Sequence, residues 1–196
     1  MIISMCDYSK LIVVTNRQLC QGDFLQQIKK VVALKPAGLI LREKDLAEAE
    51  YRTLAKAVLE ICQSDNVPLL LHSHFELAEA MEVQGVHLPY AYFMENLKHV
   101  HKLQEEKKLL VSVSCHSKEE VLAAVSNGAD QIVLGTIFAT DCKPGKIGAG
   151  LEFLKEVCEA CPVPVYAIGG INSERLPEIL KAGATGGCMM SGFMKM

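Results

Sequence analysis

The feature that most constrains how this chain folds is the alternation of short apolar runs with stretches of helical periodicity along its whole length. Runs without polar alternation are typical of strands buried on both faces, as in a parallel sheet covered by helices. We predict one strand for each of the eight runs, which span 11–15, 38–41, 67–71, 85–88, 109–113, 131–134, 163–168 and 186–190.

The segments between the runs carry apolar residues at three- and four-residue spacing, as in 45–61, 118–127 and 173–182. This spacing predicts helices that cover the outside of the sheet. Ser117, and either Asn172 or Ser173, stand where capping side chains are favoured at helix starts. Eight strands with seven intervening helices predict a single domain over 1–196, an α/β fold of the (β/α)8 TIM-barrel type. A doubly wound open sheet is the alternative.

The chain ends at Met196, shortly after the eighth run, which leaves no length for an eighth helix. We therefore expect an apolar strip between the first and seventh helices. Patches of that size seldom face water, so either a partner subunit or the N-terminal segment should cover it. On this basis we predict a homo-oligomer.

Composition excludes several classes of protein. The chain is 50% apolar and 22% charged, with a formal net charge of −3, which is ordinary for a globular protein and unlike a disordered one. No basic surface suggests a nucleic-acid partner. No apolar stretch reaches the roughly 18 residues that span a bilayer, so we expect no membrane partner and a cytoplasmic protein. The eight cysteines lie mostly in apolar segments, as buried thiols in a reducing compartment do.

Barrel enzymes place their sites at the C-terminal ends of the strands, so the residues that follow each run are the candidates. Gly169 and Gly170 follow the seventh run, and Ser191 and Gly192 follow the eighth. Loops at these positions commonly bind phosphate, because glycine lets backbone N–H groups approach the oxygens. We predict a phosphate site at these four residues; two tight turns without a ligand are the alternative.

Cations follow the second run, where Arg42 and Lys44 suit an anion clamp at the barrel mouth. A solvated charge run is the alternative. The segment 138–146 fits neither a helix nor a strand, and we interpret it as a flap whose Lys143 folds over a bound ligand. An ordinary surface loop is the alternative there.

Three of the six histidines follow strands: His72, His74 and His116. A side chain that titrates near neutrality can move protons, so these three are the catalytic candidates. We expect no metal site from His72 and His74, because few carboxylates are at hand to complete it. His87 lies within a run, and we interpret it as a core histidine with satisfied hydrogen bonds.

Several stretches in order through nearly the whole chain carry a further signal. They are LREKD at 41–45, VPLLLHSHFELA at 67–78, GVHL at 85–88, VSCHSKEE at 113–120, GADQIVLGTIFATDCKPGKIGAG at 128–150, VPVYAIGGIN at 163–172 and GATGGCMMSG at 183–192. Together they resemble the superfamily of thiamin phosphate synthases and TenI-like barrels. The resemblance implies a thiamin-pathway barrel whose partner is a small phosphorylated thiazole, with its phosphate at Gly169, Gly170 and Ser191. Further mouth positions then become ligand-binding candidates, namely Arg42, Lys44, Ser114, Thr136, Thr140 and Lys143.

The chain departs from the synthase pattern where Mg²⁺ would bind. The synthases carry an Asn-Asp pair after the third strand and an Asp after the fourth, and the two aspartates hold the ion. Here His72, Ser73 and Tyr92 stand at those positions. Mg²⁺ prefers hard oxygen anions, so we expect no cofactor, and Mg²⁺ only if the chain is a synthase.

TenI-like members also lack those aspartates, and some of them are thiazole tautomerases. The histidine that these tautomerases carry after the sixth strand is Thr136 here. We expect metal-free tautomerisation of a thiazole phosphate, with proton transfer by His116, His72 or His74. Two alternatives stay open. One is a thiamin phosphate synthase that joins hydroxymethylpyrimidine pyrophosphate to thiazole phosphate, and the other is a non-catalytic regulatory protein that binds thiazole phosphate.

Overall fold

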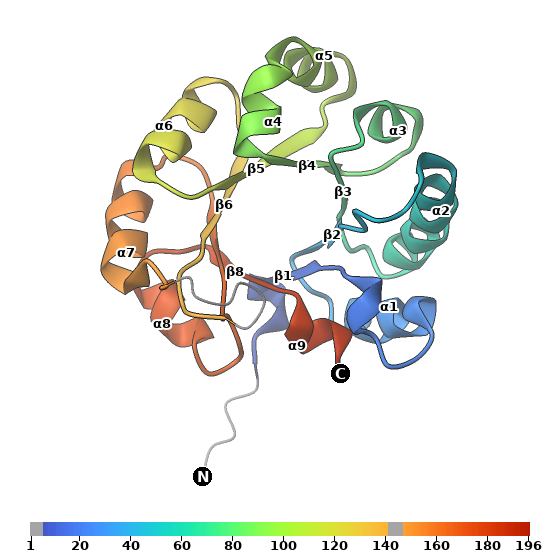
Figure 1. The fold of residues 1–196 in the computed structure, drawn as a ribbon, viewed down its shortest axis with the longest axis horizontal. Helices are drawn as coiled ribbons and strands as arrows, with labels where there is room; N and C mark the ends of the chain where they lie inside the picture. The colour runs from blue at the N-terminus through green and yellow to red at the C-terminus, as the bar shows by residue number, and fades with distance from the viewer. Residues whose placement is uncertain (1–5, 141–146) are drawn as a thin grey trace.

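A computed structural model describes residues 6–140 and 147–196. Its eight strands are all parallel and follow chain order around a closed barrel, in which β1 pairs with both β2 and β8 (Figure 1). The prediction of a (β/α)8 barrel is confirmed, and closure excludes the open sheet. The strands are β1 (Leu11–Val14), β2 (Gly38–Leu41), β3 (Leu69–His72), β4 (Gly85–Pro89), β5 (Leu110–Cys115), β6 (Gln131–Gly135), β7 (Val165–Ile168) and β8 (Gly186–Met189).

Helices form a ring around the barrel, as the spacing of apolar residues predicts (Figure 1). They are α1 (Phe24–Val32), α2 (Glu48–Ser64), α3 (Phe75–Ala80), α4 (Tyr90–Glu95), α5 (Leu97–Lys107), α6 (Lys118–Ser126), α7 (Gly150–Ala160), α8 (Leu176–Lys181) and α9 (Ser191–Met194). The predicted cap of α6 is present, because the Ser117 hydroxyl accepts a hydrogen bond from the backbone N–H of Glu120 at 3.2 Å. Asn172 accepts from the N–H of Arg175 at 2.9 Å before α8.

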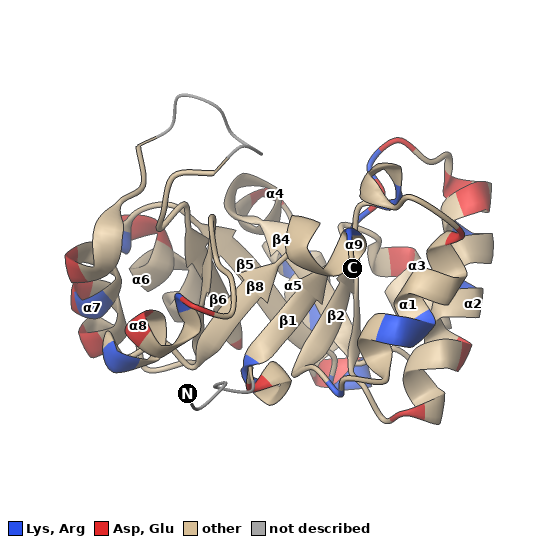
Figure 2. Cartoon of the chain, turned by 90° about the horizontal axis from the view of Figure 1, so that it is seen from below, with Lys and Arg blue, Asp and Glu red and all other residues tan. Residues whose placement is uncertain are grey.

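Apolar side chains pack on both faces of the barrel wall, which explains why the strand sequences show no polar alternation. The larger cluster lies between the strands and the helices. A smaller cluster fills the inside of the barrel, with Ile12, Val14, Ile40, Leu70, Val133 and Cys188 at its centre. The charged residues lie mainly on the helices and loops, and the strands carry almost none (Figure 2).

The side of the barrel next to β8 is covered by segments of this chain. A single turn, α9, stands where an eighth helix would be, and its Phe193 and Met194 are fully buried. The ring of Tyr8, in the 3-10 helix η1 (Tyr8–Lys10), lies 6.1 Å from that of Phe193, and Gln27 donates to the Phe193 carbonyl at 2.5 Å. Of the two expected covers, the N-terminal segment is the one that the structure shows, and it acts together with α1 and α9 on this side of the barrel.

Within 6–140 and 147–196, no helix is both long enough and apolar enough to cross a membrane.

Candidate functional site

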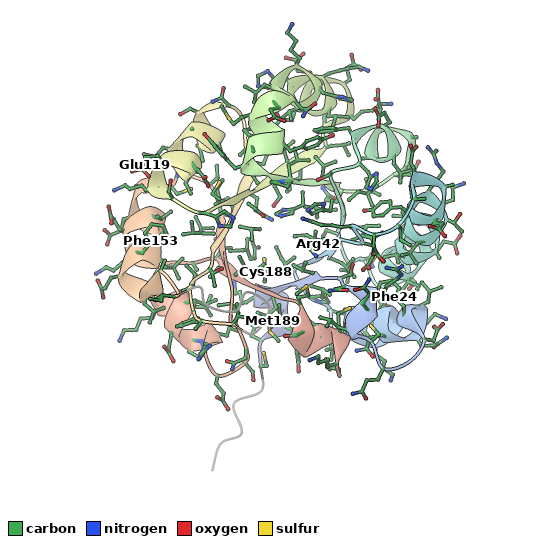
Figure 3. The ribbon with its side chains drawn as sticks, in the orientation of Figure 1. Phe24, Arg42, Glu119, Phe153, Cys188 and Met189 are labelled. Atoms are coloured by element: carbon green, nitrogen blue, oxygen red, sulfur yellow. The ribbon has the colours of Figure 1, made fainter. Side chains whose placement is uncertain are left out.

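A cavity of about 350 Å³ lies at the C-terminal ends of the strands, where the sequence predicts the site. Each of the eight strands contributes at least one residue to its wall, and residues that follow β2, β5, β6, β7 and β8 complete it. The predicted site residues that line it are Arg42, Lys44, His72, Ser114, His116, Thr136, Thr140, Gly169, Gly170 and Ser191. Arg42 and Cys188 both lie inside the ring of strands in the view along the barrel (Figure 3).

Two of the predicted residues do not line the cavity, and a third cannot be placed. The ring of His74 stacks on that of Tyr51, with 3.8 Å between centroids, because Ser73 has a left-handed backbone (φ +63°) that turns the chain after β3. Gly192 lies inside α9, and a side chain there would meet the methyl group of Met189. Lys143, the expected lid of the flap, lies outside the described residues.

The hydroxyl of Tyr51, on α2, joins the ends of β2 and β3. It donates to the Leu41 carbonyl at 2.7 Å and accepts from the His72 N–H at 3.2 Å. Arg42 follows Leu41 directly, so this buried bridge holds Arg42 and His72 at neighbouring points of the cavity wall. A cation and an imidazole are thereby brought to one surface.

Glu43 lies between the two cations in sequence, but its carboxylate points away from the cavity. It is 3% exposed, accepts from the Thr15 hydroxyl at 2.6 Å, and accepts from the backbone N–H of Arg17 at 3.0 and 3.1 Å. The N–H of Arg42 in turn donates to the Thr15 hydroxyl at 2.9 Å. Glu43 therefore ties the backbone after β2 to the end of β1, which leaves Arg42 and Lys44 to line the cavity.

The histidines of the cavity floor are neutral. Burial, followed by the charges of Lys44 and Arg42, lowers the pKa of His72 to about 4. Burial, followed by smaller effects of His72 and Arg42, lowers the pKa of His87 to about 3. The two rings lie 5.9 Å apart. Neither ring carries a positive charge near neutral pH, so Arg42 and Lys44 supply the positive charge of this wall.

His87 is held by two serines of β5. Its Nδ1 shares a hydrogen bond with the Ser112 hydroxyl at 2.9 Å, and its Nε2 shares one with the Ser114 hydroxyl at 2.7 Å. Gln131 donates to Ser112 at 3.0 Å, so the chain of polar groups is buried and satisfied. The interpretation of His87 as a hydrogen-bonded core histidine is confirmed. It also lines the cavity and orients Ser114, which sequence reasoning missed.

Two successive glycines form the turn after β7. Gly169 and Gly170 both have positive φ angles, +99° and +65°, and both line the cavity. Successive backbone N–H groups in such turns form concave sites for anions. A Cβ on Gly170 would lie 2.7 Å from the Ala139 carbonyl oxygen and 2.9 Å from Cβ of Phe138, so neither glycine position accepts a side chain without displacement.

Arg175 holds this turn from behind and was not among the predicted residues. Its Nη1 donates to the Gly170 carbonyl at 2.7 Å, and its guanidinium lies 4.6 Å from the centroid of the Phe138 ring. Arg175 lies several residues beyond Ile168, where β7 ends, so the rule that site residues directly follow a strand does not identify it. The Asn172 cap and the arginine that bonds back to the turn belong to one local structure.

His116 lines the cavity rim but is exposed. Its Nδ1 donates to the carbonyl of Gly135. Apolar side chains make up the rest of the wall. They include Val14, Ile40, Val133, Ile168, Cys188 and Met190. The cavity thus combines an apolar interior with polar groups at its upper edge, which is typical of small-molecule sites.

Fold and site together define the class, a parallel (β/α)8 barrel with a cationic cavity and a glycine turn at the C-terminal ends of its strands. The family model for thiamine monophosphate synthase matches residues 11–193. The chain belongs to this family.

Individual relatives agree with the family model. A protein of Aquifex aeolicus (strain VF5), provisionally named thiamine-phosphate synthase 2, is 36% identical over 187 residues, which are 95% of this chain and 98% of the relative. The thiamine-phosphate synthase of Clostridium tetani (strain Massachusetts / E88) is 31% identical over 92% of this chain and 86% of its own length. The solved structure of thiamine phosphate pyrophosphorylase from Pyrococcus furiosus is 25% identical, with a TM-score of 0.79 over 96% of this chain and 88% of that one.

These names correct one expectation. We expected tautomerisation in preference to synthesis, because the aspartates of the synthase pattern are missing. That preference is wrong, because relatives 31% and 36% identical over more than nine-tenths of this chain carry synthase names. The superfamily resemblance itself is confirmed.

The described cavity does not fit Mg²⁺, the ion that the synthase pattern implies. Its described lining offers cations, imidazoles, hydroxyls and backbone groups but no carboxylate, whereas Mg²⁺ in proteins is usually bound through one or two carboxylates. No cluster of three or more His, Cys, Asp or Glu side chains that could hold a metal occurs in 6–140 or 147–196.

Proposed function

We propose that this protein is a thiamin phosphate synthase, a transferase that joins hydroxymethylpyrimidine pyrophosphate to thiazole phosphate. The observation that supports the proposal is that one cavity is lined both by two cations and by a glycine turn, each of which suits an anion. Arg42 and Lys44 follow β2, while the turn at Gly169 and Gly170 and the residue Ser191 follow β7 and β8. A reaction between two phosphorylated substrates needs two such surfaces.

The chemistry requires charge stabilisation more than proton transfer. The C–O bond between the pyrimidine methylene and the diphosphate breaks, and its electron pair leaves with the diphosphate. The lone pair of the thiazole ring nitrogen forms the new C–N bond, and the nitrogen becomes the cationic thiazolium centre. No proton moves in this exchange, so neutral histidines such as His72 and His87 are compatible with it.

Each surface has a distinct task in this scheme. Arg42 and Lys44 bind the diphosphate and stabilise the negative charge that grows on it as the bond breaks. The N–H groups around Gly169 and Gly170, with Ser191, hold the thiazole phosphate so that the ring nitrogen faces the methylene. The apolar floor receives the two rings, and Ser114, fixed by His87, offers its hydroxyl to a polar substituent of the bound rings.

The test is product formation by the purified protein from both substrates, followed by chromatographic detection of thiamin phosphate. We expect product that depends on both substrates and release of one diphosphate per turnover. Arg42→Gln is expected to lower kcat/KM at least about 100-fold. The positive charge of Arg42 stabilises the transition state more than the bound substrate, because negative charge grows on the diphosphate as the bond breaks. Arg52→Gln, which removes an exposed charge on α2, is the matched control and should leave the rate unchanged. If neither the unaltered protein nor Arg52→Gln forms thiamin phosphate, in buffers with and without Mg²⁺, the proposal is refuted.

A further inference from the structure

The wall that follows β2 and β3 has the charge that a diphosphate needs without the ligands that a divalent cation needs. Arg42 and Lys44 line it as cations, and His72 adds a ring nitrogen at the end of β3. None of the described residues that line the cavity carries a carboxylate. A diphosphate that entered with Mg²⁺ would present the metal to two cations and an imidazole, which is unfavourable both in charge and in ligand type.

Glu43 and Tyr92, which carry a carboxylate and a hydroxyl close in sequence to the cavity residues, both pack away from the cavity. Glu43 is buried against Thr15 and the backbone of Arg17. Tyr92 turns its ring onto Phe75, with 5.5 Å between centroids, and does not line the cavity. The synthase pattern places its metal ligands at the positions of His72, Ser73 and Tyr92. Of these three, only His72 lines the cavity, and its ring is a poor ligand for Mg²⁺.

Arg42 is poised for an anion. It is half-buried, and its guanidinium makes no hydrogen bond or ion pair with any of the described residues. A partly desolvated cation without a partner is unfavourable, and the planar guanidinium binds phosphate oxygens through two parallel hydrogen bonds. The Tyr51 bridge and the hydrogen bond from the Arg42 N–H to Thr15 hold its backbone in place before any ligand arrives.

We propose that this chain binds the diphosphate group of its substrate directly through Arg42, Lys44 and the ring of His72, with no divalent cation between the protein and the diphosphate. The inference rests on the proposed function, because the synthase reaction is what brings a diphosphate into the cavity. It goes beyond that function, because it replaces the metal by protein cations. Arg42 is the residue whose loss should weaken diphosphate binding most.

Calorimetric titration with inorganic pyrophosphate tests the inference without any turnover. We expect one pyrophosphate to bind per chain in buffer that contains EDTA. Added Mg²⁺ should leave the apparent Kd unchanged or raise it, because the metal sequesters free pyrophosphate. Binding that appears only after Mg²⁺ is added, or tightens with it, would overturn the inference.

Variants locate the bound pyrophosphate. Arg42→Gln should weaken binding roughly ten-fold or more, as expected for the loss of a charge-assisted contact. Arg52→Gln has the same change in net charge but lies outside the cavity, so its Kd should match the unaltered protein. Gly170→Ala should keep its affinity for pyrophosphate, since it alters the turn after β7 and not the wall after β2. A loss in Gly170→Ala without a loss in Arg42→Gln would place pyrophosphate at the glycine turn and contradict the inference.

Product assays in parallel keep the two proposals separable. Metal-free pyrophosphate binding without any thiamin phosphate formation would refute the proposed function and leave the direct anion site standing. Thiamin phosphate formation that requires Mg²⁺, together with Mg²⁺-dependent pyrophosphate binding, would support the proposed function and refute the metal-free site.

Discussion

At the scale of single residues, the cavity is shaped by polar groups that are already satisfied by neighbours. Glu43 and Tyr51 fix the backbone beneath Arg42, and Ser112 and Gln131 fix His87 beneath Ser114. Because these groups are pre-oriented, the binding surfaces need little reorganisation when a ligand arrives. The buried histidines also make the protein sensitive to acid.

Acid should destabilise the protein through His72 and His87. Both have folded-state pKa values below that of an unfolded histidine, about 4 and about 3. As the pH falls below about 6.5 the unfolded state takes up protons that the folded state refuses, so the free energy of unfolding falls. Denaturant unfolding at pH 7 and pH 4.5 measures this loss, which should be on the order of a few kcal/mol.

The variant His87→Gln should make that loss smaller, because the amide can hydrogen-bond to the serines and does not titrate. The exposed His101→Gln serves as its control and should keep the full pH dependence. An unchanged slope in His87→Gln would mean that His87 is not buried in its neutral form.

Gly170→Ala should disrupt thiazole phosphate binding. An alanine there must adopt a left-handed backbone and place its methyl group 2.7 Å from the Ala139 carbonyl oxygen. We expect affinity for thiazole phosphate to fall by about ten-fold or more, measured by calorimetry. Gly22→Ala is the control, because a Cβ at Gly22 has no atom within 4 Å and its affinity should be unchanged. Normal binding by Gly170→Ala would place the phosphate elsewhere.

At the scale of elements, the strand ends bring the site together, and this is the part that sequence reasoning anticipates well. Arg42, Ser114 and Gly169 lie within one residue of a strand end, so the general rule for barrels identifies them. The rule fails for His74 because β3 ends at His72 and the left-handed Ser73 redirects the chain. His87 was missed as a cavity residue because a continuously apolar strand does not reveal which side chains point inward.

The link between β2, β3 and α2 can be tested through Tyr51. Tyr51→Phe leaves the Leu41 carbonyl and the His72 N–H without their shared partner, which should cost about 1–3 kcal/mol in the free energy of unfolding. Looser placement of Arg42 should also weaken pyrophosphate binding several-fold. Tyr92→Phe is the control, because the hydroxyl of Tyr92 makes no hydrogen bond with the described residues. Equal affinity in both variants would show that the Tyr51 bridge does not position the cationic surface.

At the scale of the whole molecule, η1 and α9 pack together through Tyr8 and Phe193 and cover one side of the barrel. Eight runs in 196 residues were enough to predict the barrel, because each run is apolar on both faces and each is followed by helical spacing or a turn. The sequence left two covers open for the last gap, a partner subunit or the N-terminal segment, because the choice depends on long-range contacts of Tyr8 and Gln27 with the four-residue helix α9. The homo-oligomer stays a prediction, and it no longer has a bare apolar strip to support it.

Removal of the Phe193 ring from α9 should destabilise the entire domain. Phe193→Ala deletes a fully buried ring, and such changes cost about 3–5 kcal/mol. Guanidinium unfolding should report this loss, whereas Met196→Ala, at a side chain that is 55% exposed, should unfold like the unaltered protein. A loss below about 1 kcal/mol for Phe193→Ala would mean that α9 contributes little to closure of the barrel.

The central claim is that one cavity holds two anions at once, one beside Arg42 and one at the turn of Gly169 and Gly170. Calorimetric titration of thiazole phosphate into protein already saturated with inorganic pyrophosphate tests it most directly. We predict that one thiazole phosphate still binds per chain, with a Kd raised by no more than about ten-fold through repulsion between the anions. Complete competition between the two ligands would contradict the account, because it would leave a single anion site and no place for the second substrate.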